Sequence, residues 1–202
     1  MLNARSQRQI EAMLSQLPAE NQERLVAAMR GIEELLGAHP AQRVPYILRP
    51  HQPGDIGWVV YRHGVLYATE YGWDEQFEAL VASVVAQFIQ NYDPKRERCW
   101  IAEMAGENVG TVMLVKDKPG VARLRLLLVD PKARGLGLGA QLVDECIRFA
   151  RRAGYKKITL WTHSVLTAAR HIYEKAGFRL MRSEPHKSWG QPVVSEHWDL
   201  EL

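Results

Sequence analysis

Cysteine is scarce in this chain of 202 residues, which contains only Cys99 and Cys146. Two cysteines cannot build a disulfide framework, so a reducing compartment is expected and we predict a cytoplasmic protein. No apolar run reaches the roughly 20 residues that span a bilayer, and the chain does not begin with the apolar core of a signal peptide. The sequence therefore predicts neither secretion nor a membrane partner.

A strong excess of charge is also missing. The formal net charge is +3, which does not indicate nucleic-acid binding but is compatible with an anionic cofactor. The His, Cys, Asp and Glu residues lack metal-ligand spacing, so no metal is expected. Neither Ser164 nor Ser188 lies in a nucleophile elbow, which argues against covalent catalysis.

The first 40 residues form a helical appendage in our interpretation. Pro18 separates two helical patterns, and Gly37 and Pro40 end the second. The apolar residues that recur at helical spacing are Ile10, Leu14, Leu17, Leu25, Val26, Met29, Ile32, Leu35 and Leu36. This helical hairpin would either pack on its own domain or serve as a homodimerisation arm.

Residues 44–202 alternate between strand and helix patterns, which indicates one α/β domain. The predicted strands cover residues 46–48, 100–104, 109–115, 121–129, 158–162, 178–181 and 193–200. Helices are predicted over residues 56–61, from Trp73-Asp74 to Ile89, over 140–153 and over 168–176.

The most informative segment is the glycine loop, residues 134–139 (Arg-Gly-Leu-Gly-Leu-Gly). It follows an apolar strand pattern and opens the predicted helix 140–153. A strand that turns through glycines into a helix leaves several backbone N–H groups unpaired, and the helix dipole adds positive potential there. Glycine lets phosphate oxygens approach the backbone closely. We therefore predict a diphosphate site.

Glycine loops of this kind bind three classes of diphosphate ligand. A P-loop requires a lysine after its last glycine, and none is present. Gly135-x-Gly137-x-x-Ala140 fits the loose dinucleotide fingerprint, but that motif needs an acidic residue at the end of the next strand. Here that strand ends Trp161-Thr162-His163, without a carboxylate. The third ligand is the pyrophosphate arm of coenzyme A.

Two motifs resemble the GNAT superfamily of N-acetyltransferases. The family signature Arg/Gln-x-x-Gly-x-Gly/Ala matches residues 134–139, and it follows a Val-x-Pro match at residues 129–131. The second hallmark, Ala-x-x-x-Tyr-x-x-x-Gly-Phe, matches Ala169, Tyr173, Gly177 and Phe178. The two motifs lie in the family's order, separated by one predicted helix and one predicted strand.

The resemblance implies a GNAT fold of the α/β (α+β) class for residues 44–202. This fold has a mixed, mostly antiparallel seven-stranded sheet with about four flanking helices. Strands 121–129 and 158–162 would splay apart and hold a thioester in the gap. The resemblance also implies acetyl-CoA as the cofactor and direct acetyl transfer to a primary amine, which we expect to be a small molecule.

The resemblance assigns most of the cofactor contacts to the main chain. The amides of Leu136 to Ala140 would bind the diphosphate, and the strand edge at Leu127 and Val129 would pair with the pantetheine. Ala169 would leave a slot for the sulfur. The cofactor residues implied are Leu127, Val129, Arg134, Gly135, Leu136, Gly137, Leu138, Gly139, Ala140 and Ala169.

Proton transfer needs an acid and a base. The resemblance makes Tyr173 the general acid that protonates the departing thiolate. Many family members carry a Glu base on the strand before the glycine loop, but that stretch reads Arg-Leu-Arg-Leu at residues 123–126. Glu70 and His63 are the candidate bases, with Glu103 and an ordered water as further alternatives.

Other residues are expected to line the acceptor pocket. Residues 63–71 should connect the first two helices of the domain. Glu184, His186 and Trp189 should lie between the last two strands, and His163 where a strand meets the next helix, near the thioester. Each of these residues could equally serve only the fold.

The N-terminal helices faintly resemble the dimerisation helices of MarR-type regulators, which are sometimes fused ahead of a GNAT domain. Residues 17–29 carry that resemblance. The chain leaves no room for a winged helix-turn-helix before them, so we expect no nucleic-acid contacts. A non-catalytic acyl-CoA sensor attached to a regulatory arm is the alternative to an enzyme.

Overall fold

The computed structural model describes Leu14, residues 17–35 and residues 45–202, and it divides the chain into two compact units, Met1–Val44 and Pro45–Leu202. In the first unit, helix α2 (Ala19–Leu35) confirms the helix expected after Pro18. The helix expected before Pro18 falls largely outside the described residues. Leu25, Val26, Met29 and Ile32 of α2 are exposed. Its roles in dimerisation and as a MarR-like helix stay predictions.

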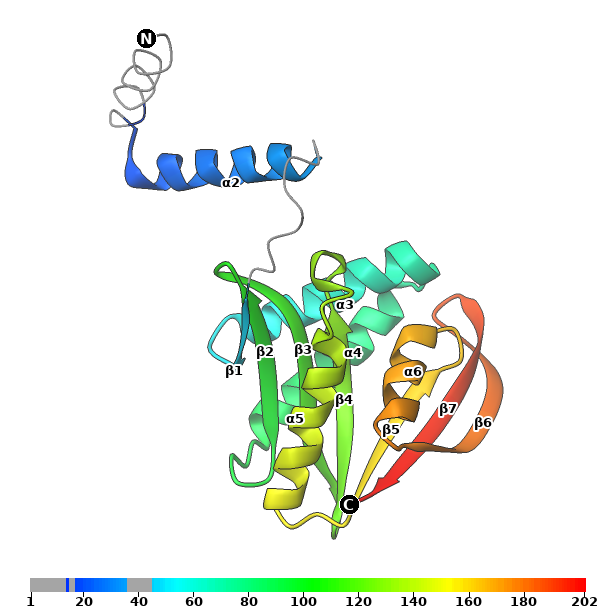
Figure 1. The fold of residues 1–202 in the computed structure, drawn as a ribbon. Helices are drawn as coiled ribbons and strands as arrows, with labels where there is room; N and C mark the ends of the chain where they lie inside the picture. The colour runs from blue at the N-terminus through cyan, green and yellow to red at the C-terminus, as the bar shows by residue number, and fades with distance from the viewer. Residues whose placement is uncertain (1–13, 15–16, 36–44) are drawn as a thin grey trace. The chain divides into compact units, whose positions relative to one another are not determined.

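The second unit is built on one seven-stranded sheet in the order β1-β2-β3-β4-β5-β7-β6 (Figure 1). Only β4 and β5 run parallel; all other neighbours are antiparallel, which confirms the expected sheet. The strands are β1 (Tyr46–Pro50), β2 (Arg98–Met104), β3 (Glu107–Lys118), β4 (Val121–Val129), β5 (Lys157–His163), β6 (Arg179–Ser188) and β7 (Gln191–Glu201).

Two helices cover each face of the sheet (Figure 1). One face carries α3 (Asp55–Tyr71) and α4 (Glu75–Gln90), and the other carries α5 (Leu138–Arg152) and α6 (Thr167–Lys175). A short 3-10 helix, η1 (Pro131–Ala133), joins β4 to the glycine loop. None of the described helices is long and apolar enough to cross a membrane.

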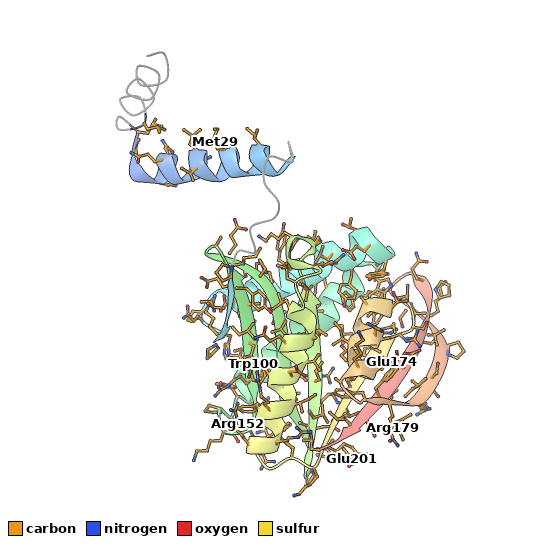
Figure 2. The ribbon with its side chains drawn as sticks, in the orientation of Figure 1. Met29, Trp100, Arg152, Glu174, Arg179 and Glu201 are labelled. Atoms are coloured by element: carbon orange, nitrogen blue, oxygen red, sulfur yellow. The ribbon has the colours of Figure 1, made fainter. Side chains whose placement is uncertain are left out.

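Each helical layer has its own core. On the α5 face, Trp100 of β2, which is labelled in Figure 2, lies edge-on to Phe149 with 5.6 Å between ring centroids. On the other face, α4 buries Phe77, Val81, Val85 and Phe88, which recur every three or four residues as an amphipathic helix requires. The two apolar layers fix the strands of the sheet between them.

Helix α3 is much longer than predicted, and this corrects the expectation for residues 63–71. They form the second half of α3 rather than a connection, because nothing before Gly72 breaks the helix. Gly72 ends it with a left-handed φ of 68°. The helix begins at Asp55, one residue before the predicted start, and the carboxylate of Asp55 pairs with Arg49 at 2.6 Å.

Strands β6 and β7 are also longer than predicted, and only the two-residue turn Trp189-Gly190 joins them. Glu184 and His186 therefore lie within β6, not between the strands. The charged residues and Pro185 hide the strand pattern in the sequence. An edge strand tolerates such residues, because one side of its backbone pairs with no neighbour.

Candidate active site

The glycine loop begins where β4 ends. Asp130 donates its N–H to the Val109 carbonyl at 2.8 Å, and its carboxylate accepts from the Lys132 N–H at 3.2 Å and pairs with Arg62 at 2.7 Å. This buried carboxylate ties the loop to β3 and α3. Gly135 and Gly137 then adopt φ values of 78° and 77°, which side-chain-bearing residues rarely adopt.

The loop presents a row of unpaired amides. Gln141 is the first residue of helix α5 whose N–H donates to a backbone carbonyl, that of Gly137 at 3.2 Å. The N–H groups of residues 135–140 have no backbone acceptor in the part of the chain that the structure describes. A Cβ built on Gly135 or Gly137 would meet nothing within 4 Å, so the space in front of the loop is open. Free amides beside open space at a helix N-terminus fit a diphosphate.

Gly139 is required for a different reason. It is buried, and a Cβ there would lie 2.7 Å from Cδ1 of Ile172. The missing side chain lets the start of α5 pack against α6. This places the glycine loop next to the helix that carries Tyr173.

The main-chain edge of β4 opens toward β5. The two strands pair only from Val121–Lys157 to Leu124–Leu160, and then they diverge (Figure 1). Beyond that point the register with β3 moves from Arg125–Met113 to Leu128–Thr111, so Leu126 and Leu127 together oppose one residue. This is a β-bulge, and Leu126 adopts a left-handed φ of 52° within it.

The bulge sets the direction of the Val129 polar groups. Because Asp130 bonds to Val109, the next position, Val129 opposite Gly110, is a non-hydrogen-bonded pair. The N–H and carbonyl of Val129 therefore point away from β3, into the gap beside β5. A linear amide chain such as pantetheine could pair with this edge as an added strand.

A cavity of about 90 Å³ lies at the splay, and it is lined by residues of α3 and α4 from one face of the sheet and of α6 from the other. The volume matches only about three water molecules, which suits a small substituent. Sequence reasoning placed five of its lining residues at the site, and the structure brings them together: His63, Leu127, His163, Ala169 and Tyr173. The lining is completed by Tyr67, Trp73, Phe77, Leu80, Val81, Val84, Arg123, Leu124, Arg125, Leu126, Trp161, Thr162 and Leu166.

Tyr173 of α6 is buried in this lining, with 5% of its surface exposed. Burial raises its pKa well above the usual value, and the nearby Tyr67 and Cys146 act in the same direction. The phenol therefore stays protonated at neutral pH and presents an O–H donor. Tyr67 shows the same burial effect on its pKa.

Two buried histidines line the cavity as neutral imidazoles. Burial lowers the pKa of His63 to about 4, and burial together with His186 lowers that of His163 to about 4. Nδ1 of His63 lies 2.8 Å from the Val59 carbonyl and donates to it, since a carbonyl can only accept. Its Nε2 then carries a lone pair and has no hydrogen-bond partner among the described residues.

The carboxylates proposed as bases lie elsewhere. Glu70 forms an ion pair with Arg134 at 2.6 Å, linking α3 to the glycine loop, and Arg134 Nε donates to the Val129 carbonyl at 3.4 Å. Glu103 pairs with Arg49 at 2.8 Å. Among the described residues, no carboxylate lines the cavity.

The cavity wall includes two cations from β4. Arg123 pairs with Asp117 at 2.6 Å, whereas no ion pair is formed by Arg125 with any described carboxylate. Burial, and to a lesser extent Arg123, lower the pKa of Arg125, while the carboxylate of Asp117 acts in the opposite direction. Sequence reasoning noted these arginines as a departure from the family pattern but missed them as lining residues. The alternation of β4 could have found them, because they flank the core residue Leu124.

An aromatic cluster backs the acceptor side. Trp189 holds a left-handed φ of 51° in the β6–β7 turn, and its ring lies 4.3 Å from that of Trp73 and 4.9 Å from that of His163. Its carbonyl accepts the Asp74 N–H at 3.3 Å. Trp189 thus supports the wall from behind, while Glu184 and His186 are not among the lining residues. No described group of His, Cys, Asp and Glu could hold a metal ion.

Solved structures define the class first. A putative acetyltransferase from Salmonella typhimurium, crystallised with its cofactor acetyl-CoA, superimposes with a TM-score of 0.62 at 19% identity. The match covers 78% of this chain and 94% of that one. A ribosomal-protein-alanine N-acetyltransferase from Brucella melitensis gives a TM-score of 0.64 at 17% identity over 77% and 99% of the two chains. The fold is that of the GNAT acetyltransferases.

The sequence defines the family. Residues 39–178 match the profile of the Acetyltransferase (GNAT) family. The chain therefore belongs to this family, which confirms the fold and the enzyme class expected from the two motifs.

Curated relatives share about a third of their aligned residues with the chain. An uncharacterized N-acetyltransferase from Schizosaccharomyces pombe is 31% identical over 59% of this chain and 73% of its own length. N-acetyltransferase 8 from Homo sapiens is 30% identical over 53% and 50%. N-acetylaspartate synthetase from Rattus norvegicus is 32% identical over 43% and 29%. The chain thus spans half or less of the last two proteins.

Proposed function

We propose that this protein transfers an acetyl group from acetyl-CoA directly to a primary amine, most simply that of a small molecule. The observation that carries the proposal is the row of unpaired amides from Gly135 to Ala140, which adjoins the open edge of β4 and the cavity at Tyr173. The relative from Rattus norvegicus is named for N-acetylaspartate, the acetylated form of a small amine. The cavity has the volume of about three water molecules, which leaves room for the reacting groups of such an acceptor.

The main chain would hold the cofactor. The amides of Leu136 to Ala140 face the diphosphate position, and Leu127 and Val129 offer their strand edge to the pantetheine. Arg134 lies beside the loop, where Glu70 balances its charge. When bound here, acetyl-CoA supplies the activated acyl group and a thiol leaving group. The Val129 N–H, directed into the gap, would stabilise negative charge on the acyl oxygen.

The side chains would manage protons. His63 lines the cavity, and the lone pair on its Nε2 would accept the proton of the amine. The amine becomes strongly acidic as the C–N bond forms, so an imidazole with a low pKa suffices. Glu70 stays the alternative base, although it lies outside the cavity lining and pairs with Arg134. The Tyr173 hydroxyl donates to sulfur as the C–S bond breaks, and Ala169 leaves room beside it.

The test is binding followed by turnover. Acetyl-CoA should raise the melting temperature of the protein, while NAD should not. Release of free thiol should then depend on an added amine, with amino acids, other small amines and polyamines as the panel. No stabilisation by acetyl-CoA would contradict the assignment of the glycine loop.

A non-catalytic acyl-CoA sensor is favoured by one observation, the lack of a carboxylate among the described lining residues. Such a sensor would be stabilised by acetyl-CoA but would release no thiol with any amine. The two assays therefore separate the enzyme from the sensor.

A further inference from the structure

Arg125 is the one charge of the described cavity lining without an obvious role. It belongs to β4, immediately before the bulge at Leu126 and Leu127, and it lines the same cavity as Tyr173. Its neighbour Arg123 is paired with Asp117, whereas Arg125 forms no ion pair with any described carboxylate. A partly buried guanidinium is costly to keep unpaired, so the position favours an anionic ligand.

The charge balance of the lining supports the same conclusion. The described lining holds two cations, Arg123 and Arg125, and no carboxylate. His63 and His163 are neutral, and Asp117, which pairs with Arg123 and acts more distantly on Arg125, offsets one of the two positive charges. One net positive charge remains in a wall that is otherwise largely apolar or aromatic. In such a site, a single charged group fixes the orientation of a small ligand.

The proposed function supplies an acceptor amine but no anion at this position, because the diphosphate belongs to the glycine loop beyond the bulge. We propose that Arg125 binds the carboxylate of the acceptor, so that the substrates are small amines bearing a carboxylate, such as amino acids. This inference rests on the proposed N-acetyltransfer. A planar guanidinium matches a carboxylate with two parallel hydrogen bonds.

The same charge would assist the reaction. A cation beside the bound amine disfavours the ammonium form, so it lowers the pKa of the amine and increases the neutral fraction that can attack. Arg125 would therefore contribute to substrate selection and to amine deprotonation in a site where the described lining carries no carboxylate base. It acts as a binding residue and does not exchange a proton itself.

Matched acceptors test the selection. Phenylalanine is compared with its amide and with 2-phenylethylamine, and methionine with its amide and with 3-(methylsulfanyl)propylamine. The amide has a less basic amine than the amino acid and the decarboxylated compound a more basic one. A preference for the acid over both therefore cannot arise from amine basicity. We expect kcat/KM for the acids to be at least about 10-fold higher, and equal or better use of the decarboxylated amines would overturn the inference.

Variants of Arg125 locate the effect. Arg125→Gln should raise KM for the acids by about 10- to 100-fold and change KM for the amides and decarboxylated amines by less than about 3-fold. Arg125→Lys, which keeps the charge but not the paired hydrogen bonds, should fall between. Arg179→Gln is the control, because Arg179 is exposed on the outer strand β6 (Figure 2). An equal loss for all three compounds of a set would overturn the inference.

Binding without turnover separates this inference from the proposed function. Stabilisation by acetyl-CoA shows that each variant is folded and holds the cofactor. If no amine releases thiol but phenylalanine and methionine still raise the melting temperature of the wild type and not of Arg125→Gln, the transfer reaction fails and the carboxylate site stands. If thiol release occurs without dependence on a carboxylate, the carboxylate site fails alone. Absence of both turnover and stabilisation by the amino acids overturns both.

Discussion

The two sides of the splayed site are built from different parts of the chain. On the cofactor side, the candidate contacts are main-chain groups: the amides from Gly135 to Ala140 and the edge of β4 at Val129. On the acceptor side, they are side chains, including His63 and Arg125. Main-chain recognition needs a particular backbone and so leaves glycines at fixed spacing. Side-chain recognition can change with each substrate, so the acceptor side leaves no common motif.

The largest expected effect is on the cofactor side. Gly137→Val should abolish acetyl-CoA binding, because a β-branched residue resists a φ of 77° and its side chain enters the open space before the amides. Titration of the melting temperature with acetyl-CoA checks this.

Gly154→Val is a matched control for that variant. Gly154 has the same φ of 77°, and a Cβ there also meets nothing within 4 Å, but it lies at the opposite end of α5. Both variants should lose about 1–2 kcal/mol of stability, and only Gly137→Val should lose the cofactor. Loss of binding in both would mean that backbone strain, not the loop, is responsible.

The acceptor side should show the next effect. Tyr173→Phe should lower kcat by about 100-fold, the scale of a lost general acid, with little change in acetyl-CoA affinity. Tyr155→Phe provides the control, since that buried hydroxyl donates to the Arg96 carbonyl at 3.0 Å, away from the cavity. Turnover of Tyr173→Phe at the wild-type rate would remove Tyr173 from the mechanism.

Acid should destabilise the acceptor side through its buried histidines. The pKa of His63 is about 4 in the folded protein against 6.5 ordinarily, so the unfolded chain binds more protons between these values. Each histidine's contribution to the free energy of unfolding is therefore fully present above about pH 6.5. As the pH falls toward 4, about 1–3 kcal/mol per histidine is lost. Urea unfolding across this range measures the slope, which His63→Gln should flatten. The exposed His171→Gln should leave it unchanged.

The smallest effect concerns the contact between the two sides. Gly139→Ala should cost about 1 kcal/mol, because its Cβ would lie 2.7 Å from Cδ1 of Ile172. The variant Ile172→Val removes that methyl group and should recover most of the loss in the double variant. Thermal unfolding of the four proteins gives the coupling. Additive losses would show that the close approach is not the cause.

The sequence predicted the main-chain features of the cofactor side better than the side chains and connections of the acceptor side. The glycine loop and the Ala169 to Phe178 motif were readable because backbone geometry constrains them, and they led to the sheet as well. The length of α3 could not be predicted, because residues 63–71 carry neither a strong helix pattern nor a helix breaker. The β6–β7 turn was hidden because Trp189 occupies a left-handed position that ordinarily takes glycine or asparagine. That conformation depends on packing against Trp73, which no local pattern encodes.

The bulge at Leu126 and Leu127 has a consequence for the phase of β4. If the pairing of Arg125 with Met113 continued in regular register without the bulge, Val129 would stand opposite Val109 and direct its polar groups to β3, where they would be bound within the ladder. Leu128 would then stand opposite Gly110 instead of Thr111, which would turn its side chain away from the core it now fills. A single inserted residue thus sets which amide reaches the acyl oxygen and which leucine seals the interior.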